Sequence, residues 1–314
     1  MRVVFFGSPE FAVPSLEALL GEGFEVLAVV SQPDRPHGRS WSQPVAPPVK
    51  RAAQEEDVPV LQPERPTDPA FVSRLAELAP DIGVVVAYGH ILKPELLAIP
   101  RLGMVNLHPS LLPKLRGAAP IEWAIINGLD QTGVSIMQMD AGMDSGPVLH
   151  QIAEPLPADI TGGELAAHLS EIGAEAMVEA LSLLAQGTLT PRRQIDADAT
   201  YAPKLSRDGA RVNWSGPPLQ IERLIRALDP RPGAWTELNG RAVKVFGPGS
   251  SADGRTGKRA DGAAGTVLEA GERLVVATGA GPLAIEEVQP EGKARMLAVE
   301  WVRGRGVEAG QRFQ

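Results

Sequence analysis

Apolar runs and helical repeats alternate along the first part of the chain. The runs have the length of strands and cover residues 2–6, 24–30, 58–61, 82–87, 105–107 and 133–139. The stretches between them place apolar residues at helical spacing, near 9–20, 49–56, 70–78, 94–99 and 121–126. Strands that are apolar on both faces and alternate with helices indicate a parallel sheet covered on both sides. We therefore predict an α/β fold with a Rossmann-like, doubly wound, mostly parallel sheet.

A long helix and an irregular segment follow this alternation. Thr161 and Glu164 fit a capping box, and an apolar stripe continues from there until Gly187. Residues 189–208 mix Thr, Pro, Arg, Asp and Ala without a sustained period, which is typical of a linker. We therefore predict a first domain over 1–188 and a linker over 189–208.

The last third of the chain has the pattern of a small β domain. After a helix near 218–228, short strand-like runs cover 233–238, 242–246, 265–269, 274–277 and 283–288. Asn239 and Gly240 form the dipeptide with the strongest short-range hairpin signal. About five short strands at roughly ten-residue spacing are typical of a small barrel. We predict an OB-like β-barrel domain over 209–314.

Composition and charge restrict the chemistry and the location. The chain has no cysteine, which excludes disulfides, thiolate metal sites and a cysteine nucleophile. No apolar run approaches the roughly 20 residues that cross a bilayer, and the start lacks a charged leader, so we expect a cytoplasmic protein. Residues 1–208 carry 15 Lys and Arg against 26 Asp and Glu, a net −11, and residues 209–314 carry 15 against 12, a net +3. This asymmetry fits either a nucleic-acid partner for the second half or an uneven solvated surface.

Two polar side chains interrupt the apolar run that ends at residue 108. Asn106 and His108 stand two residues apart, so they share one face at the carboxyl end of a strand, where doubly wound sheets bind their ligands. The first strand, by contrast, ends at Gly7-Ser8-Pro9, with one glycine where a dinucleotide site needs three. This argues against an NAD-linked dehydrogenase. Ser8 instead fits the N-cap of the next helix.

A second polar loop, MDAGMDSGP at 139–147, directly follows a predicted strand. Its carboxylates, Asp140 and Asp144, lack the alternating oxygen ligands of a calcium loop, and no second histidine stands at ligand spacing to His108. We therefore expect no metal, and we interpret this loop as the source of an acid–base partner for His108. For Asp140, a plain Asx turn is an open alternative.

Residues 103–147 together resemble the folate-dependent formyltransferases. The motifs that carry the resemblance are Asn106-x-His108, SLLP at 110–113 and MDAGMDSG at 139–146. Further similar segments are QPDRPHGR at 32–39, VVVAYG at 84–89, LRGAAPI at 115–121, TGVSIMQMD at 132–140 and YAPKL at 201–205. The resemblance runs nearly end to end and is weakest over 36–48 and 247–264.

The resemblance implies that a formyl group is transferred from N10 of the co-substrate 10-formyltetrahydrofolate to an amine. Such a reaction passes through a tetrahedral intermediate with a negative oxygen. We predict that Asn106 and His108 stabilise this oxygen and that Asp144 is the acid–base partner of His108. The resemblance further implies that the folate is bound by Ala87, Tyr88, Gly89, Ser110, Leu111, Leu112, Pro113, Asp140 and Gly142.

The resemblance also implies that methionyl initiator tRNA accepts the formyl group, which is a step that supports translation initiation. Residues 31–49 form an unusually long connection, and in the family this loop enters the acceptor end of the tRNA. The predicted tRNA contacts are Arg35, Arg39, Trp41, Lys204, Arg207 and Arg211. Trp41 fits stacking on an unpaired base and packing on the sheet equally well, and each of these cations taken singly also fits a solvated surface charge. We expect a monomer.

Two other functions share parts of this pattern. A formyltransferase for a small amine, or a 10-formyltetrahydrofolate hydrolase, needs Asn106, His108 and Asp144 but neither the 31–49 loop nor the barrel. A non-catalytic RNA-binding protein needs only the barrel. Substitution of Asn106 or His108 separates an enzyme from a binding protein, and a choice of amines separates the two kinds of enzyme.

Overall fold

The computed structural model describes residues 1–36, 44–247 and 262–314. The chain divides into two compact units. The first comprises Met1–Pro120, Gln131–Pro155 and Ala166–Ala202, and the second comprises Ile121–Asp130, Leu156–Leu165 and Pro203–Gln314. The domain boundaries given by the sequence pattern stay a prediction. In the described part of the chain, no helix is both long and apolar enough to span a membrane.

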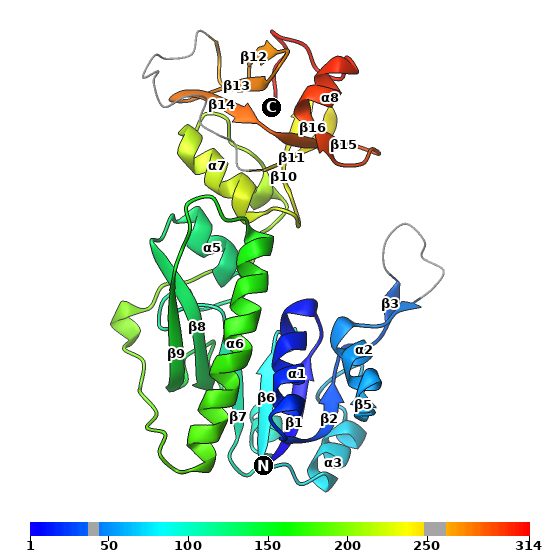
Figure 1. The fold of residues 1–314 in the computed structure, drawn as a ribbon, viewed down its shortest axis with the longest axis vertical. Helices are drawn as coiled ribbons and strands as arrows, with labels where there is room; N and C mark the ends of the chain where they lie inside the picture. The colour runs from blue at the N-terminus through cyan, green and yellow to red at the C-terminus, as the bar shows by residue number, and fades with distance from the viewer. Residues whose placement is uncertain (37–43, 248–261) are drawn as a thin grey trace. The chain divides into compact units, whose positions relative to one another are not determined.

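A seven-stranded sheet forms the centre of the first unit (Figure 1). Its strand order is β5-β2-β1-β6-β7-β8-β9. The strands are β1 (Arg2–Gly7), β2 (Glu25–Val30), β5 (Val60–Leu61), β6 (Ile82–Val86), β7 (Met104–His108), β8 (Gln131–Gln138) and β9 (Val148–Pro155). The neighbouring pairs β5–β2, β2–β1, β1–β6 and β6–β7 are parallel, whereas the pairs β7–β8 and β8–β9 are antiparallel. The predicted mostly parallel sheet is thereby confirmed, and β9 is a strand that the sequence pattern did not indicate.

Helices connect the parallel strands, one further helix connects β7 to the antiparallel β8, and a long helix follows β9. A short two-stranded ribbon lies in the long connection after β2. The helices are η1 (Glu10–Ala12), α1 (Val13–Gly21), α2 (Pro48–Glu55), α3 (Pro69–Glu77), α4 (Pro94–Leu97), α5 (Pro120–Ile126) and α6 (Gly162–Ala185), and the ribbon is β3 (Arg35–Pro36) with β4 (Pro44–Val45). The predicted N-cap role of Ser8 is wrong, because a 3₁₀ turn precedes α1 and Ala12 is its N-cap. Ser8 Oγ instead accepts a hydrogen bond from Gln32 N at 3.1 Å.

Helix α6 packs directly on β7. A Cβ atom at Gly173 of α6 would lie only 2.5 Å from Cδ1 of Leu107, so the missing side chain is what allows this close approach. Neighbouring residues of a strand point to opposite faces of the sheet. Asn106 and His108 therefore point away from α6, to the face of β7 on which a site is expected.

Two small antiparallel sheets and two helices form most of the second unit. The first sheet has the order β10-β11-β15-β16, and the second has the order β12-β13-β14. The elements are η3 (Asp208–Ala210), α7 (Pro218–Ala227), β10 (Ala234–Leu238), β11 (Arg241–Phe246), β12 (Val267–Ala270), β13 (Leu274–Thr278), β14 (Gly281–Ile285), β15 (Glu287–Pro290), β16 (Met296–Leu297) and α8 (Ala298–Arg303). The predicted strand 283–288 is two strands, one in each sheet. The predicted strand-rich C-terminal region is confirmed, while its OB-like arrangement stays a prediction.

Local sequence signals are borne out at two places in this unit. Asn239 and Gly240 have φ angles of 52° and 75°, the positive values that a tight hairpin turn of this type requires, and they join β10 to β11. The capping box of α6 is also present. Thr161 N donates to Glu164 Oε2 at 2.9 Å, and Glu164 N donates to Thr161 Oγ1 at 3.3 Å.

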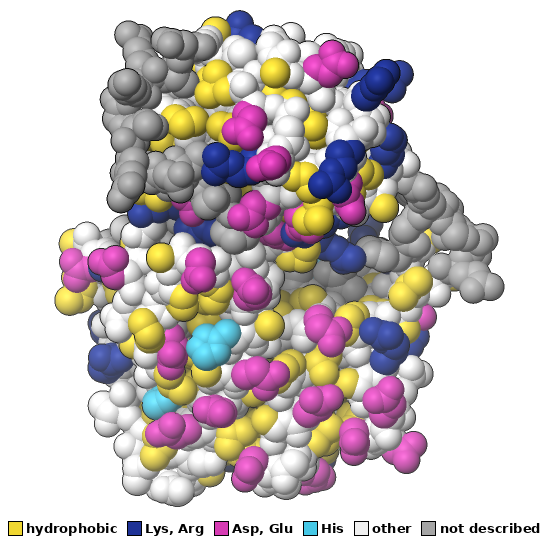
Figure 2. All heavy atoms as spheres, turned by 45° about the horizontal axis from the view of Figure 1, so that its top comes forward, with side chains coloured by type: hydrophobic (Ala, Val, Ile, Leu, Met, Phe, Trp, Pro, Cys, Tyr) yellow, Lys and Arg dark blue, Asp and Glu magenta, His cyan; other side chains and the backbone are white. Residues whose placement is uncertain are grey.

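Charged side chains are distributed unevenly on the face shown in Figure 2. Asp and Glu side chains are scattered over the first unit, and Lys and Arg side chains are more frequent on the second. The view agrees with the net charges of −11 and +3 for residues 1–208 and 209–314. A polyanionic partner is therefore attracted more strongly to residues 209–314 than to residues 1–208.

Candidate active site

The carboxyl end of β7 lies where the sheet changes from parallel to antiparallel pairing. β7 pairs in parallel with β6 and antiparallel with β8, and His108 lies opposite Ser135. His108 is 4% exposed, whereas Asn106 is half-buried. The fold therefore offers an amide and a nearly dry imidazole on one face of a strand end, which is the usual ligand position in this architecture.

His108 and Asp144, which we call the dyad, meet at this strand end. Nδ1 of His108 and Oδ2 of Asp144 are 3.8 Å apart. The other ring nitrogen, Nε2, lies 2.9 Å from the carbonyl oxygen of Leu115. Because a carbonyl oxygen only accepts hydrogen bonds, Nε2 carries a hydrogen, and Nδ1 is the nitrogen that gains or loses a proton. The dyad thus directs one proton-binding nitrogen toward one carboxylate.

Asp144 is held in an unusual conformation by the loops around it. Its φ angle is 52°, in the left-handed region that costs a residue with a side chain about 1 kcal/mol or more. Its Oδ2 accepts a hydrogen bond from Gly117 N at 2.8 Å, and its carbonyl oxygen accepts one from Gln194 Nε2 at 2.8 Å. Gln194 stands in an irregular stretch, and no local pattern there indicates that it reaches this loop.

Burial lowers the pKa of His108, and the charge of Asp144 and the hydrogen bond to the Leu115 carbonyl only partly oppose it. The folded protein therefore keeps this imidazole neutral to a lower pH than its ordinary 6.5. Below pH 6.5 the unfolded chain binds this proton more readily than the folded chain does. This group therefore lowers the free energy of unfolding as the pH falls below 6.5 and leaves it unchanged at higher pH.

The Asp144→Asn variant should have a His108 pKa below that of the wild type. The substitution removes the negative charge that raises this pKa and leaves the burial that lowers it. Nitrogen chemical shifts of the imidazole, followed by NMR against pH in both proteins, measure the difference. Asp140→Asn is the matched control, because Asp140 is not among the groups that shift this pKa. An unchanged or raised pKa in Asp144→Asn contradicts the assignment of the dyad.

Asp140 forms the Asx turn that the sequence left as an alternative. Its Oδ1 accepts a hydrogen bond from Gly142 N at 2.9 Å, and Ser145 Oγ lies within 3.0 and 3.1 Å of its two carboxylate oxygens. The carboxylate thus shapes its own loop, which exposes Gly142 and its neighbour Met143. No three His, Asp or Glu side chains of residues 1–36, 44–247 and 262–314 gather as a metal site requires.

The predicted folate residues 87–89 present mainly backbone. The Tyr88 ring is 2% exposed and packs edge-on against Phe6, with 5.4 Å between the ring centroids. Burial raises the pKa of its hydroxyl to about 12. Ala87 and Gly89 have φ angles of 47° and 84°, and the Tyr88 carbonyl accepts a hydrogen bond from Gln32 Nε2 at 3.0 Å. If this turn contacts the folate, the contact therefore comes from the backbone of 87–89 and from the side chain of Ala87.

Residues 110–113, which are predicted to bind the folate and which we call the wall, are held in place by one buried hydroxyl, that of Ser135. Ser135 Oγ donates to the Ser110 carbonyl at 2.6 Å and accepts from Leu112 N at 3.0 Å and from Gln151 Nε2 at 2.8 Å. Gln151 Nε2 also lies 3.0 Å from the Leu112 carbonyl. Leu112 is buried, while Leu111 and Pro113 are partly exposed. The roles of Ser135 and Gln151 are not indicated by the sequence pattern, in which a serine inside an apolar strand is the only signal.

The predicted tRNA contacts fall into three groups. Arg35 is exposed in β3, and Arg39 and Trp41 lie outside the described residues. In the second unit Lys204 is exposed. Arg207 and Arg211 both lie over the ring of Trp235, at 5.2 and 5.0 Å from its centroid.

Arg211 borders two hollows in the surface of the second unit, with volumes of about 470 and 410 Å³. The first is also lined by Asn127, Gln220 and Arg223, and the second by Arg312. Arg211 Nη2 lies 3.3 Å from Glu237 Oε2, so this carboxylate offsets part of its charge.

Comparison with known proteins identifies the family of the chain. The family "Formyl transferase" matches residues 1–181, and the family "Formyl transferase, C-terminal domain" matches residues 204–306. The chain is 48% identical over 314 residues to the methionyl-tRNA formyltransferase of Roseiflexus castenholzii, with 100% of this chain and 99% of that protein covered. It is 45% identical over 316 residues to that of Thermobifida fusca, again with 100% and 99% covered.

Among solved structures, HypX from Aquifex aeolicus in complex with tetrahydrofolic acid has the same fold. The TM-score is 0.63 at 18% identity, with 96% of this chain and 46% of HypX covered. At this identity the likeness shows the fold alone. The matched families and the identity to full-length curated relatives show more, and the chain belongs to the formyltransferase family, in the group of the methionyl-tRNA formyltransferases.

Proposed function

We propose that the chain, as a cytoplasmic monomer, transfers the formyl group of 10-formyltetrahydrofolate to the amino group of methionyl initiator tRNA, and so supports translation initiation. The observation that carries the proposal is the dyad, a nearly dry imidazole whose proton-binding nitrogen faces a carboxylate at the end of β7. The names of the curated relatives support the choice of acceptor.

Bond changes at the formyl carbon assign roles to the three predicted catalytic residues. The methionyl amine attacks this carbon, a C–N bond forms, and the carbonyl electrons move to the oxygen. The side-chain N–H of Asn106 donates to that oxygen, a contribution typically worth ~10²–10³ in rate, and His108 stabilises the same oxygen once its ring is protonated. His108 Nδ1 takes the proton that the amine loses, and Asp144 stabilises the imidazolium. The C–N10 bond then breaks, and N10 receives a proton, for which the Nδ1–H of His108 is the donor.

The folate co-substrate is assigned to the loops around the dyad. The backbone of 87–89 and the turn made by Asp140 and Gly142 edge the pterin ring, and residues 110–113 form the wall on the folate side. Two features support this assignment. The 87–89 turn keeps its large side chain in the core, so its backbone is left to meet a flat ring. The wall is fixed from behind by Ser135, so it keeps its shape without a ligand.

The tRNA backbone is assigned to Lys204, Arg207 and Arg211 of the second unit, with Arg35 and residues 39 and 41 of the long loop at the acceptor end. Arg211→Ala should weaken binding of methionyl initiator tRNA about 3- to 10-fold and reduce the salt slope of log Kd by about 1, because each phosphate contact releases about one counterion. Binding titrations at several salt concentrations measure both. Arg273→Ala is the control, an exposed cation that the proposal leaves out. An unchanged slope in Arg211→Ala contradicts this contact.

A formylation assay tests the function as a whole. The full chain is incubated with 10-formyltetrahydrofolate and, separately, methionyl initiator tRNA, methionyl elongator tRNA, a free small amine and water alone. Formylation that is fastest by far on the initiator tRNA supports the proposal. Equal or faster transfer to the small amine, or hydrolysis without an acceptor, favours the other enzymes considered above. Tight tRNA binding without turnover favours an RNA-binding protein.

A further inference from the structure

Part of the segment with the sequence pattern of a linker is bound to the first unit. We call residues 192–202 the strap; they include η2 (Asp196–Asp198). At one end, Arg192 and Val148 exchange two backbone hydrogen bonds of 2.8 Å, so the strap runs beside β9 in Figure 1. At the other end, Ala202 N donates to the Arg116 carbonyl at 2.7 Å. The strap is therefore anchored on both sides of its middle part.

Gln194 in the strap binds both loops that hold the dyad. Its Nε2 donates to the carbonyl oxygens of Asp144 and Gly146 at 2.8 and 2.7 Å. Its Oε1 accepts a hydrogen bond from Arg116 Nε at 3.0 Å. One amide thus uses both its donors on the Asp144 loop and its acceptor on the loop that contains Arg116.

The loop around Arg116 contacts both members of the dyad. The carbonyl of Leu115 accepts from the imidazole of His108, and Gly117 N donates to Asp144. Arg116 itself is 4% exposed, and its Nη1 lies 2.9 Å from a carboxylate oxygen of Asp196 in the strap. The strap therefore binds Arg116, which stands in the chain between Leu115 and Gly117, the two residues whose backbone contacts the dyad.

Thr200 in the strap supports the same loop at a second point. Its Oγ1 accepts a hydrogen bond from Leu115 N at 2.9 Å. Leu115 has a φ angle of 58° and Asp144 one of 52°, so both residues adopt the left-handed conformation that disfavours a side chain. Each is a direct partner of His108, and each is bound by a strap side chain. Such a conformation persists only where the surroundings impose it.

We propose that Gln194 and Thr200 are positioning residues for formyl transfer, because they hold the backbones of Asp144 and Leu115 in the strained conformations that set the dyad. This inference rests on the proposed function. It gives the middle of the predicted linker a part in the chemistry, although no strap side chain is assigned to the substrates.

The first test uses Gln194→Met in the full chain, which keeps the length of the side chain and removes its donors and its acceptor. We expect kcat for formylation of methionyl initiator tRNA to fall about 10- to 100-fold, the range typical of residues that orient a reactive group, and KM for the tRNA to change less than about 3-fold. The midpoint of the His108 titration by NMR should also move, because the carboxylate beside it is no longer fixed. Asp198→Asn is the control, an exposed strap residue whose side chain bonds no other described residue.

The second test compares Thr200→Val with Thr200→Ser. Valine removes the oxygen that accepts from Leu115 N, so kcat should fall, whereas serine keeps this oxygen and should retain the kcat of the wild type. The pair stays informative if Gln194→Met does not fold, which the thermal midpoint of each variant reveals. Wild-type kcat and an unmoved His108 titration in both Gln194→Met and Thr200→Val overturn the inference. If the wild type itself does not formylate the tRNA, the proposed function fails, and the NMR arm still decides whether the strap positions the dyad.

Discussion

His108→Ala should lower the turnover of formyl transfer by about 10³-fold or more while the affinity for methionyl initiator tRNA stays within about 2-fold. The expected loss is large because the imidazole has two tasks in the proposed reaction. It accepts the amine proton on Nδ1, and in its protonated form it returns a proton to the leaving group. In this mechanism Asp144 acts only through the imidazole, whose Nδ1 lies 3.8 Å from its carboxylate, so the substitution also removes the contribution of Asp144. Single-turnover assays with saturating folate measure the chemical step, and filter binding measures tRNA affinity.

His168→Ala is the matched control for this substitution. His168 lies on α6, and its side chain is 49% exposed, with Nε2 at 3.6 Å from Glu154 Oε2. It is thus a histidine with a carboxylate neighbour but without burial, and its removal should leave turnover within about 2-fold, as for other exposed ion pairs of little energetic weight. If His108→Ala keeps more than a tenth of the wild-type turnover, the dyad is not the acid–base group of this enzyme.

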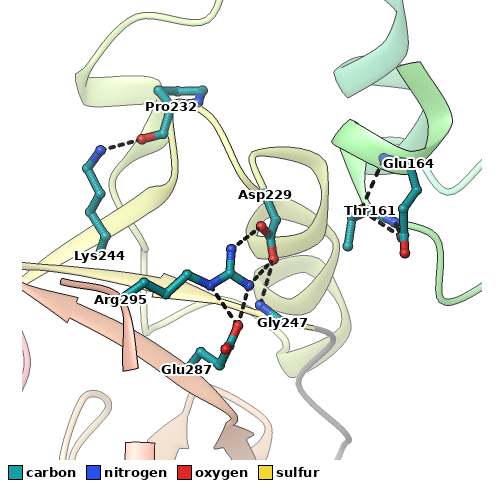
Figure 3. Close-up of polar contacts among 8 residues, drawn as sticks. All are labelled: Thr161, Glu164, Asp229, Pro232, Lys244, Gly247, Glu287 and Arg295. Atoms are coloured by element: carbon teal, nitrogen blue, oxygen red, sulfur yellow. Dashed lines mark hydrogen bonds and ion pairs between the residues drawn. The ribbon is translucent and has the colours of Figure 1, made fainter. Parts of the chain in front are cut away.

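Arg295→Met should lower the free energy of unfolding of the second unit by about 2–4 kcal/mol. Arg295 binds Asp229 through Nη1 at 2.6 Å and Nη2 at 3.0 Å, and it also contacts Glu287 (Figure 3). The side chain of Asp229 is only 7% exposed, so removal of the guanidinium leaves a nearly dry carboxylate without its cation. The loss is below the 3–5 kcal/mol of a fully buried pair because Arg295 is 35% exposed and Gly247 N still donates to Asp229 at 2.9 Å.

Urea unfolding followed by tryptophan fluorescence measures this loss in the full chain. Trp123, Trp214, Trp235 and Trp301 all belong to the second unit, so the signal reports mainly on it. Arg273→Met is the control, because Arg273 and Glu269 are both about half exposed and 3.9 Å apart, and such pairs contribute about 0–1 kcal/mol. Equal losses in the two variants would show that the Asp229 pair has no more weight than a surface pair.

Much of the fold can be predicted from local sequence signals. Each of these signals depends only on residues a few positions apart, so it can be recognised without the rest of the structure. The apolar runs of β1 and β6, the Asn239-Gly240 turn and the Thr161 capping box are all found where their patterns stand. The errors arise where a longer-range contact decides. β9 mixes polar and apolar residues and becomes a strand because β8 pairs with it. Ser8 does not cap α1, because a 3₁₀ turn precedes this helix, and the Ser8 hydroxyl instead accepts a hydrogen bond from Gln32 N, 24 positions along the chain.

The candidate site likewise contains residues that a local pattern indicates and residues that only long-range contacts reveal. Asn106, His108 and Asp144 stand out because polar groups at strand ends are unusual and chemically suited to formyl transfer. Gln194 and Thr200 do not, since their bonds join residues 50 and 85 positions apart, and nothing in the local pattern near 194–200 indicates which loops they reach. The candidate catalytic residues could thus be named from the sequence, whereas the contacts of Gln194 and Thr200 with their loops required the packed chain.

The hydroxyl of Ser135 has no bonding capacity left. A hydroxyl offers one hydrogen and two lone pairs, and the Ser110 carbonyl, Leu112 N and Gln151 Nε2 take all three. None of these partners titrates near neutrality, and solvent does not reach the oxygen, which is in a fully buried residue. The backbone of residues 110–113 is therefore held by contacts that do not change with pH near neutrality, whereas the protonation of the His108 imidazole beside it does.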